Sequence, residues 1–339
     1  MSPLRVLMIT SEWASDPGHT AHFIARQVRF LRAAGVDVDV FQFRGARRPL
    51  RYLAAWAGLR RRLGRQRYDL IHAQFGQSGL LALPKRLPLV VTFRGDDLFG
   101  ILGHDGRPTP AGRLLQRLSR LVARRADATI LVSEHLKRYL THSGTVHIVP
   151  SGLDLDLFRC IPRDEARRHL GLPPAGHLIL FVGDPDDPRK RYSLARQAVD
   201  LLNRRVAAEL VIGWRVPHDE MPFYMNACDA LVFTSREEGS PNAVKEALAC
   251  DLPVVSVAVA DVPLRLQGIP GCEVCAEASP ETIAAALERT LGRHGRSGGR
   301  GPEAARQLDE RLLTDRVIAV YRSVLAGTNQ NQRSERAHV

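Results

Sequence analysis

The sequence predicts an α/β protein made of two Rossmann-like domains, each built on a doubly wound parallel sheet. Short apolar runs suited to buried strands alternate with helical stretches from the start of the chain, an order typical of parallel sheets with helical crossovers. The length of 339 residues exceeds the size at which a single core usually stops growing. A second series of apolar runs begins at Leu178, after a connector at 150–176.

Six apolar runs in the first half are predicted strands, with helical stretches between them. They are Arg5–Thr10, Val36–Phe43, Leu70–Ala73, Leu89–Phe93, Ala128–Val132 and Val146–Val149. The connector carries a predicted helix at Arg163–Leu170. The predicted strands of the second half are Leu178–Gly183, Glu209–Ile212, Leu231–Thr234 and Pro253–Val257.

The end of the chain is predicted to be a helix from about Glu303 to Leu325, followed by a polar stretch, Gly327–Val339, that we expect to be disordered. The predicted domains are 1–160 and 161–310, with 311–325 as a closing helix and 326–339 as a disordered tail.

Charge and hydropathy limit the class of protein. The formal net charge is +12, and of the 48 Lys and Arg residues four are lysines and 44 are arginines. The arginines are spread widely and aromatic residues are few, so no specific nucleic-acid ligand is expected. No apolar run suits a signal peptide or approaches the roughly 20 residues of a membrane-spanning helix. We expect a cytoplasmic protein, with a peripheral position at the inner face of the cell membrane as the alternative.

The cysteines and acidic triplets give weak signals for a metal. Five cysteines scattered through a long chain indicate reduced thiols. Cys272 and Cys275 form one C-x-x-C pair, but no second pair or histidine cluster completes a zinc site. D-x-D triplets begin at Asp154 and Asp184, and such triplets are common by chance. We expect neither a metal nor a cofactor.

A basic segment lies between Arg44 and Arg67. Within it Leu53, Trp56, Leu59 and Leu63 recur at near-helical spacing, which predicts a basic amphipathic helix. We expect this helix to pack on its own sheet with a solvated basic face. The alternative is that it lies on an anionic membrane.

The most informative segment is Ser235–Val255, because it joins a strand end, a glycine turn and a helix start. Ser240 is predicted to cap that helix, with Pro241 at its first position. A helix that starts at the carboxyl end of a parallel strand points free N–H groups into the crevice where α/β proteins bind ligands, and phosphate suits such a site. Glu238 in the turn and Glu246 in the helix can accept hydrogen bonds from sugar hydroxyls.

Glu238 and Glu246 form an E-x7-E pattern that resembles the retaining GT-B glycosyltransferases, in particular glycosyltransferase family four. The flanking segments 226–235 and 245–250 resemble the family too, as do 69–73, 126–134 and 149–158. The resemblance covers about residues 4–325. It implies the GT-B fold, in which two Rossmann-like domains face each other across a cleft and the last helix returns to the first domain.

The resemblance also implies a donor site for a nucleotide-diphosphate sugar. Lys190 fits the family's phosphate-binding lysine, whereas Asp184 follows Gly183 where family members carry an arginine. Arg189 or Arg191 would replace that arginine, because a guanidinium can hold phosphate through two hydrogen bonds. The remaining donor residues are Glu238, Gly239, Ser240, Pro241, Asn242 and Glu246, with Glu238 on the sugar and Glu246 on the ribose. Lys190, Glu238 and Arg189 are the expected catalytic residues.

The acceptor side is expected in the amino-terminal domain. Gly18 and His19 follow the first strand, in the position of the family's glycine-bearing loop. Arg94 stands where family members often carry a sugar-contacting histidine, and Asp96 and Asp97 follow it. Arg94 cannot act as a base because it stays protonated. Downstream, Leu264 stands where a glutamate often occurs, which changes the contacts of that loop.

The function implied is transfer of a sugar from a nucleotide-diphosphate sugar to a hydroxyl acceptor with retention of anomeric configuration, in polysaccharide, lipid-linked glycan or natural-product biosynthesis. Such chemistry needs stabilisation of the departing diphosphate and positioning of the acceptor. Two alternatives stay open: a GT-B sugar-nucleotide epimerase, and a non-catalytic protein that binds the sugar nucleotide or the acceptor.

Overall fold

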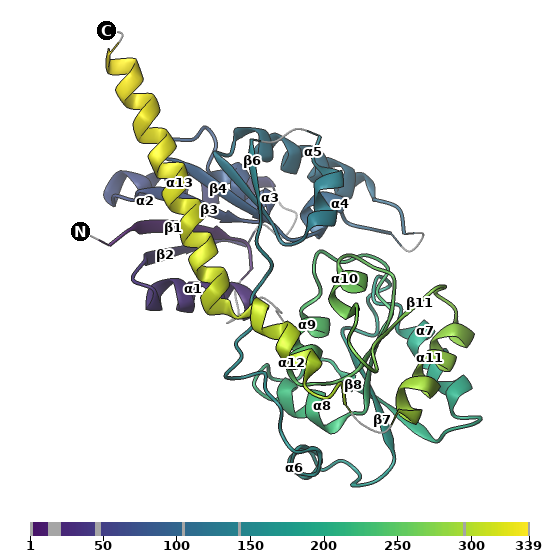
Figure 1. Ribbon diagram of the computed structural model, residues 1–339. Helices are drawn as coiled ribbons and strands as arrows, with labels where there is room; N and C mark the ends of the chain where they lie inside the picture. Colours follow the sequence, from purple (N-terminus) through teal and green to yellow (C-terminus); the bar gives the residue numbers. More distant parts are fainter. Residues whose placement is uncertain are drawn as a thin grey trace. The chain divides into compact units, whose positions relative to one another are not determined.

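The computed structural model describes residues 3–12, 22–44, 49–103, 106–141, 144–293 and 296–337. The chain forms two compact units (Figure 1). Unit 1 comprises Met1–Leu102, Pro108–Gly152 and Glu310–Val339, and unit 2 comprises Gly103–Arg107 and Leu153–Asp309. The second unit therefore begins at 153, where 161 was predicted. Leu153 already belongs to it because the Leu153 N–H donates to the Leu308 carbonyl at 2.7 Å.

Unit 1 contains six parallel strands in the order β2-β1-β3-β4-β5-β6. They are β1 (Arg5–Thr10), β2 (Asp37–Gln42), β3 (Leu70–Gln74), β4 (Leu89–Phe93), β5 (Ala128–Leu131) and β6 (Thr145–Ile148). Every residue of β3, β4 and β5 is buried. Strands covered on both faces need continuous apolar runs, which made these three strands recognisable. All six strands of this sheet were predicted to within one residue at each end.

Helices cover both faces of this sheet. They are α1 (His22–Ala33), α2 (Pro49–Arg65), α3 (Gly76–Leu81), α4 (Asp96–Phe99), α5 (Pro110–Arg125), the 3-10 helix η1 (Glu134–Tyr139) and α13 (Glu310–Ala337). α1 and α13 share one core with Val6 and Met8 of β1. α2, α3 and α5 share the other core with Leu7 and Ile9. Alternate side chains of β1 therefore point to opposite faces of the sheet, and helices pack on both faces.

The last helix differs from the prediction. α13 continues to Ala337, so residues 326–337, predicted to be disordered, are helical, and Figure 1 shows the end of this helix extending beyond the sheet. Leu313, Val317 and Tyr321 of α13 are buried in a core of unit 1. The tail was predicted to be disordered because its composition is polar. It continues a helix whose first turns carry an apolar stripe. Among the described residues, no helix is both long and apolar enough to cross a membrane.

Unit 2 contains five parallel strands in the order β11-β10-β9-β7-β8. They are β7 (His177–Val182), β8 (Ala208–Gly213), β9 (Ala230–Phe233), β10 (Val254–Val257) and β11 (Glu273–Cys275). The first four were predicted. β11 was missed because three residues at a sheet edge carry too little periodicity to be recognised.

The helices of unit 2 are α6 (Arg163–Leu170), α7 (Tyr192–Leu202), α8 (Met221–Ala227), α9 (Asn242–Ala249), α10 (Val262–Leu266), α11 (Pro280–Gly292), α12 (Arg300–Ala305) and the 3-10 helix η2 (Arg306–Leu308). The chain moves from β7 to β8 on one side and then to β9 on the other side of β7. The order of strands therefore reverses between β7 and β9, and in open α/β sheets ligands bind outside the carboxyl ends of the strands at such a point.

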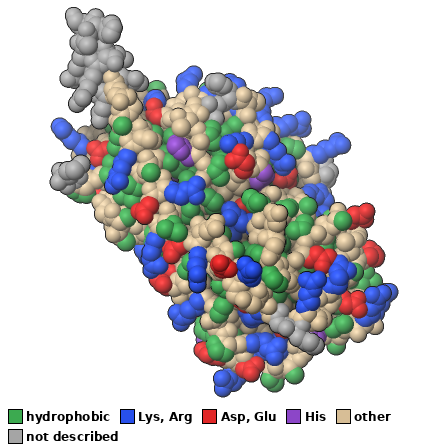
Figure 2. All heavy atoms as spheres, in the orientation of Figure 1, with side chains coloured by type: hydrophobic (Ala, Val, Ile, Leu, Met, Phe, Trp, Pro, Cys, Tyr) green, Lys and Arg blue, Asp and Glu red, His purple; other side chains and the backbone are tan. Residues whose placement is uncertain are grey.

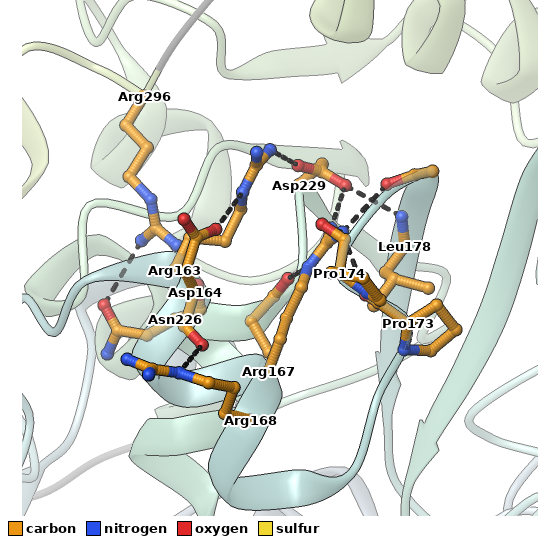
Figure 3. Close-up of polar contacts among 12 residues, drawn as sticks. Arg163, Asp164, Arg167, Arg168, Pro173, Pro174, Leu178, Asn226, Asp229 and Arg296 are labelled. Carbon is orange, nitrogen blue, oxygen red and sulfur yellow. Dashed lines mark hydrogen bonds and ion pairs between the residues drawn. The ribbon is translucent and has the colours of Figure 1, made fainter.

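A buried arginine joins α6 to the start of β7 (Figure 3). Arg167 is 1% exposed. Its guanidinium donates to the Ala227 carbonyl at 2.9 Å, to an Asp229 carboxylate oxygen at 3.0 Å, and to three carbonyls of the loop before β7. The same Asp229 oxygen accepts the N–H of Leu178 at 2.8 Å. This cluster fixes the point at which the second sheet begins.

Candidate functional site

The loops after β7 and β9 meet at the point where the strand order of unit 2 reverses. Thr234, which follows β9, donates its hydroxyl to the Lys190 carbonyl at 2.8 Å. The Arg236 N–H donates to the Arg189 carbonyl at 2.9 Å. These bonds bring the two predicted halves of the donor site together, although the residues stand more than 40 positions apart in the chain.

Lys190 and Glu238 form an ion pair at the centre of this site. Lys190 Nζ lies 2.6 Å from Glu238 Oε1, and the side chains are 19% and 12% exposed. Burial would raise the pKa of the Glu238 carboxyl, but Lys190, Arg189 and a hydrogen bond from Ser235 together lower it. The cation also lies 5.9 Å from the centre of the Phe233 ring. The pair is therefore partly shielded from solvent, where charges interact strongly.

Gly183 packs against the side chain of Lys190. Its φ is +143°, a conformation that residues with a side chain rarely adopt. A Cβ built on Gly183 would lie 3.2 Å from two carbons of the Lys190 side chain. Gly183 thus acts at the site through the packing of Lys190.

The two arginines beside Lys190 have different surroundings. Arg189 donates to an Asp187 carboxylate oxygen at 3.3 Å. Arg191 lies in the left-handed region, with φ of +51°, and its Nε donates to the Thr234 carbonyl at 2.6 Å. The side chain of Arg191 therefore joins the loop after β7 to the backbone that follows β9. Asp184, in the position of the family's arginine, accepts the N–H of Asp186 at 3.0 Å. The contacts of both arginines with a donor stay predictions.

The start of α9 corrects one prediction. The helix begins at Asn242 with Pro241 as its N-cap residue, and no side chain caps it. Ser240 was predicted to be the cap, but its hydroxyl donates to Asp261 Oδ2 at 2.8 Å. Gly239 precedes it in the same turn. A helix start without a side-chain cap suits a phosphate. Glu246 lies one helical turn further on and is 6% exposed.

Asp261 is a site residue that the sequence interpretation missed. Its Oδ2 also accepts from Arg265 Nε at 2.9 Å, and its carboxylate is 8% exposed. The available signal was the acidic residue four positions before an arginine, at the start of a helix. Asp261 and Arg265 hold Ser240, and with it the turn that leads into α9.

The predicted acceptor residues lie at one end of the sheet of unit 1, except that Gly18 and His19 fall outside the described residues. Arg94 follows β4 and donates to Gln74 Oε1 at 2.7 Å and to Ser151 Oγ at 2.6 Å. Its guanidinium carbon lies 4.4 Å from the centre of the Phe23 ring. Burial lowers the pKa of Arg94 to about 10. The guanidinium is therefore held by partners within unit 1.

Asp96 and Asp97 differ in exposure. Asp97 is 1% exposed and accepts backbone N–H groups of Gly76, Arg94 and Gly95 at 3.0 to 3.1 Å. Burial raises the pKa of its carboxyl to about 6, against the effect of those three donors. Asp96 is exposed. Asp97 thus fixes the loop after β4, and of the two only Asp96 presents its carboxylate to solvent.

A buried histidine in unit 1 was not singled out from the sequence. His72 on β3 has Nδ1 2.6 Å from the Tyr321 hydroxyl and Nε2 2.8 Å from the Thr92 hydroxyl. Burial, with the charge of Arg94, lowers the pKa of His72 to about 3. The ring is therefore neutral and joins α13 to the sheet.

This histidine predicts a pH dependence of stability. The unfolded chain binds a proton at His72 below about pH 6.5, whereas the folded chain does so only near pH 3. The contribution of neutral His72 to the unfolding free energy is complete above pH 6.5 and is lost as the pH falls. We expect the unfolding free energy to fall between pH 6 and pH 5 by about 1 kcal/mol less in His72→Gln than in the parent. Urea titrations at both pH values test this, and equal declines in both proteins would contradict it.

The cysteine pair carries no sign of a metal or redox site. Burial raises the pKa of both Cys272 and Cys275 to about 11, so neither thiol is activated. Cys272 Sγ accepts the N–H of Val254 at 3.3 Å. Across the part of the chain that the structure describes, no group of three or more His, Cys, Asp or Glu side chains could hold a metal.

Comparisons with known proteins identify the family to which most of the chain is similar. Residues 5–157 match the family described as Glycosyltransferase Family 4, and residues 177–293 match the family described as Glycosyl transferases group 1. The D-inositol 3-phosphate glycosyltransferase 1 of Catenulispora acidiphila is 28% identical over 312 aligned residues, which cover 77% of this chain and 73% of that protein. The D-inositol 3-phosphate glycosyltransferase of Nocardiopsis dassonvillei is 25% identical over 309, covering 76% and 71%.

Solved structures show the same fold. The sucrose-phosphate synthase of Thermosynechococcus elongatus has a TM-score of 0.79 at 19% identity, covering 96% of this chain and all of that one. Anabaena HepE, solved in complex with UDP-glucose, has a TM-score of 0.70 at 17% identity, covering 94% of this chain and all of that one. The two parallel sheets, together with the matched family regions, show a glycosyltransferase of the GT-B class.

The chain belongs to glycosyltransferase family four, as its two matched regions indicate. The resemblance noted in the sequence is confirmed, and the protein is a glycosyltransferase.

Proposed function

We propose that this protein transfers a sugar from a nucleotide-diphosphate sugar to a hydroxyl acceptor with retention of anomeric configuration, and that the donor binds in unit 2. The observation that carries the proposal is the Lys190–Glu238 ion pair, which lies at the reversal of strand order between β7 and β9. The relatives named D-inositol 3-phosphate glycosyltransferase and the UDP-glucose complex of HepE support this donor class.

Each residue has a role in this proposal. Lys190 and the N–H groups at the start of α9 bind the diphosphate and stabilise its growing charge as it departs, with Arg189 nearby. Glu238 orients Lys190 and accepts hydrogen bonds from the sugar, and Glu246 accepts them from the ribose. The acceptor oxygen bonds to the anomeric carbon on the face from which the diphosphate leaves, and the departing phosphate takes the hydroxyl proton. Because these groups supply the positive charge, we propose a reaction without metal.

The donor site is tested first by binding. With EDTA present, we expect thermal stabilisation by one of a panel of UDP-, GDP- and dTDP-sugars. Glu246→Ala should weaken that donor's affinity by about tenfold to a hundredfold, because a buried hydrogen bond to a carboxylate contributes about 1.5–3 kcal/mol. Glu237→Ala, next to the motif, is the matched control and should bind normally. A donor that stabilises both variants equally would remove Glu246 from the site.

Turnover then separates the alternatives. With the identified donor and a panel of hydroxyl acceptors that includes D-inositol 3-phosphate, NMR of the anomeric proton should show the configuration of the donor in the product. An inverted product would contradict the retaining mechanism. Isomerisation of the donor without acceptor would indicate an epimerase, and binding without turnover against every acceptor class would favour the non-catalytic alternative.

A further inference from the structure

We propose that the outward sides of α2 and α5 form a surface that docks on an anionic lipid bilayer. This surface, the basic face, carries five exposed large apolar side chains: Leu50, Leu53 and Trp56 on α2, and Leu114 and Leu121 on α5. The proposal is independent of the sugar donor and of the reaction.

The structure divides the apolar positions of α2 between two sides. Leu59 is fully buried and Leu63 packs against the same core of unit 1. Leu50 and Leu53 are 78% and 63% exposed. The sequence interpretation had placed Leu53 and Trp56 on the same packed stripe as Leu59. Packing on the sheet and contact with a membrane were alternatives in that interpretation. They are compatible, because different sides of α2 serve them.

Trp56 is held at the edge of this surface. Its indole Nε1 donates to the Leu83 carbonyl at 3.0 Å, while 39% of the residue stays exposed. Arg60, one turn along, donates to the Pro84 carbonyl at 2.7 Å. These bonds fix α2 on the loop after α3, so the exposed side of α2 has a defined orientation. A tryptophan with one bonded end and an exposed ring suits the boundary between lipid and water.

α5 repeats the arrangement. Leu114 and Leu121 are 56% and 38% exposed and stand seven residues apart, which places them on one side of the helix. Val122 and Ala123 are buried on the other side. Thr109 caps the helix by accepting the N–H of Gly112 at 3.1 Å.

The charge of both helices is positive throughout. α2 and α5 each contain five arginines and no acidic residue. Arg51, Arg61 and Arg65 are exposed on α2, and Arg113, Arg117, Arg124 and Arg125 on α5. Leucines flanked by arginines match an anionic bilayer, because the apolar side chains enter the acyl boundary and the cations meet the headgroups.

The two helices lie on the same face of the sheet. Both contribute to the core that contains Leu7 and Ile9, and the right-handed crossovers place α3 between them. α1 and α13 occupy the opposite face. A flat bilayer can therefore meet α2 and α5 together.

The pattern favours lipid over nucleic acid. A nucleic-acid surface needs cations, but it gains little from exposed leucines. The face seen in Figure 2 shows Lys and Arg side chains scattered among Asp and Glu side chains, with no continuous basic groove. The basic face differs because its two helices lack acidic residues.

Cosedimentation with vesicles tests the proposal on the full chain at 150 mM salt. We expect binding to vesicles of phosphatidylcholine with one third phosphatidylglycerol, and at least about tenfold weaker binding to phosphatidylcholine alone, because several arginines each contribute about fivefold. The triple variant Leu50→Ser, Leu53→Ser and Leu114→Ser should lose about tenfold or more in affinity for the anionic vesicles.

Matched control variants distinguish binding through the basic face from unspecific binding to vesicles. Leu312→Ser changes a leucine of α13 that is 53% exposed on the other face, and it should bind vesicles like the parent, whereas Leu53→Ser should not. For charge, Arg61→Glu with Arg117→Glu should reduce binding more than Arg204→Glu with Arg293→Glu, which change the net charge equally on unit 2. Thermal melting of each variant confirms that it is folded.

Three outcomes would overturn the proposal. One is no binding to anionic vesicles at physiological salt. The second is equal binding by the leucine variants and the parent, which would indicate unspecific attraction of a basic protein to any polyanion. The third is concentration-dependent dimerisation that the leucine variants abolish without any vesicle binding, which would assign the surface to a second copy of the chain.

Discussion

Lys190→Ala is expected to lower kcat by about a hundredfold to a thousandfold while the fold remains intact. Removing one preorganised group that stabilises charge in a transition state typically has an effect of this size. Lys190 is suited to that role because its ammonium group lies 2.6 Å from Glu238 at the carboxyl ends of β7 and β9. Steady-state kinetics with the identified donor measure the effect.

The loss of the cation will also leave Glu238 without its main partner. Glu238 is 9% exposed, and its pKa is now lowered by Lys190 and Arg189 against the effect of burial. Lys190→Ala should therefore melt at a lower temperature than the parent, because an unpaired buried carboxylate is costly. Adding Glu238→Gln removes that charge, so the double variant should regain thermal stability without regaining activity.

This pairing distinguishes catalysis from folding. If the double variant regained both stability and turnover, Lys190 would serve only to pair Glu238. Lys137→Ala is the control, since Lys137 pairs with Glu134 on the surface, where the two side chains are 51% and 67% exposed. Exposed ion pairs contribute about 0–1 kcal/mol, so this variant should match the parent in stability and turnover.

Arg167→Met is expected to lower the unfolding free energy of unit 2 by about 3–5 kcal/mol, the usual effect of removing one partner of a buried ion pair. The guanidinium donates to Asp229 at 3.0 Å and to four backbone carbonyls (Figure 3). Methionine fills much of the volume but offers none of these hydrogen bonds, so the carbonyls and the carboxylate lose their donor.

Arg168→Met provides a matched control on the same helix. Arg168 is exposed, and its guanidinium donates to the Asp164 carbonyl of its own helix at 3.2 Å (Figure 3). Its replacement should change stability by less than about 0.5 kcal/mol. Urea unfolding of both variants, followed by circular dichroism, measures the difference. Equal stability of the two variants would show that the Arg167 cluster does not hold the start of β7.

The regular elements were predictable because their signals are local. α6 was predicted at its observed limits, Arg163–Leu170, and the strands of unit 1 to within one residue. The E-x7-E segment was recognised because Glu238 lies in the turn and Glu246 in the helix of a strand-turn-helix connection, which neighbouring residues indicate. What the sequence did not reveal was the direction of individual side chains. Arg167 and Arg168 are adjacent arginines of one helix, yet one is 1% exposed and the other is exposed.

The same limit applies within the candidate site. Serine often caps helices, but the hydroxyl of Ser240 donates to Asp261, 21 residues away. Arg191 has the charge of a phosphate ligand, but its Nε donates to the Thr234 carbonyl. Arg94 replaces a sugar-contacting histidine of the family and donates to Gln74 and Ser151. Each partner stands far away in the chain, so no local pattern indicates it.

The sequence by itself determined the α/β class, the alternation of strands and helices, the family and the glutamate pair, because periodicity and motif spacing are properties of neighbouring residues. The tertiary structure alone decided which charged side chains are paired. It placed Lys190 against Glu238, buried Arg167 against Asp229, and left Leu50 and Leu53 exposed among arginines. The physical reason is that the free energy of a charge or an apolar side chain depends on what surrounds it after folding, and crossovers of 40 or more residues supply those surroundings.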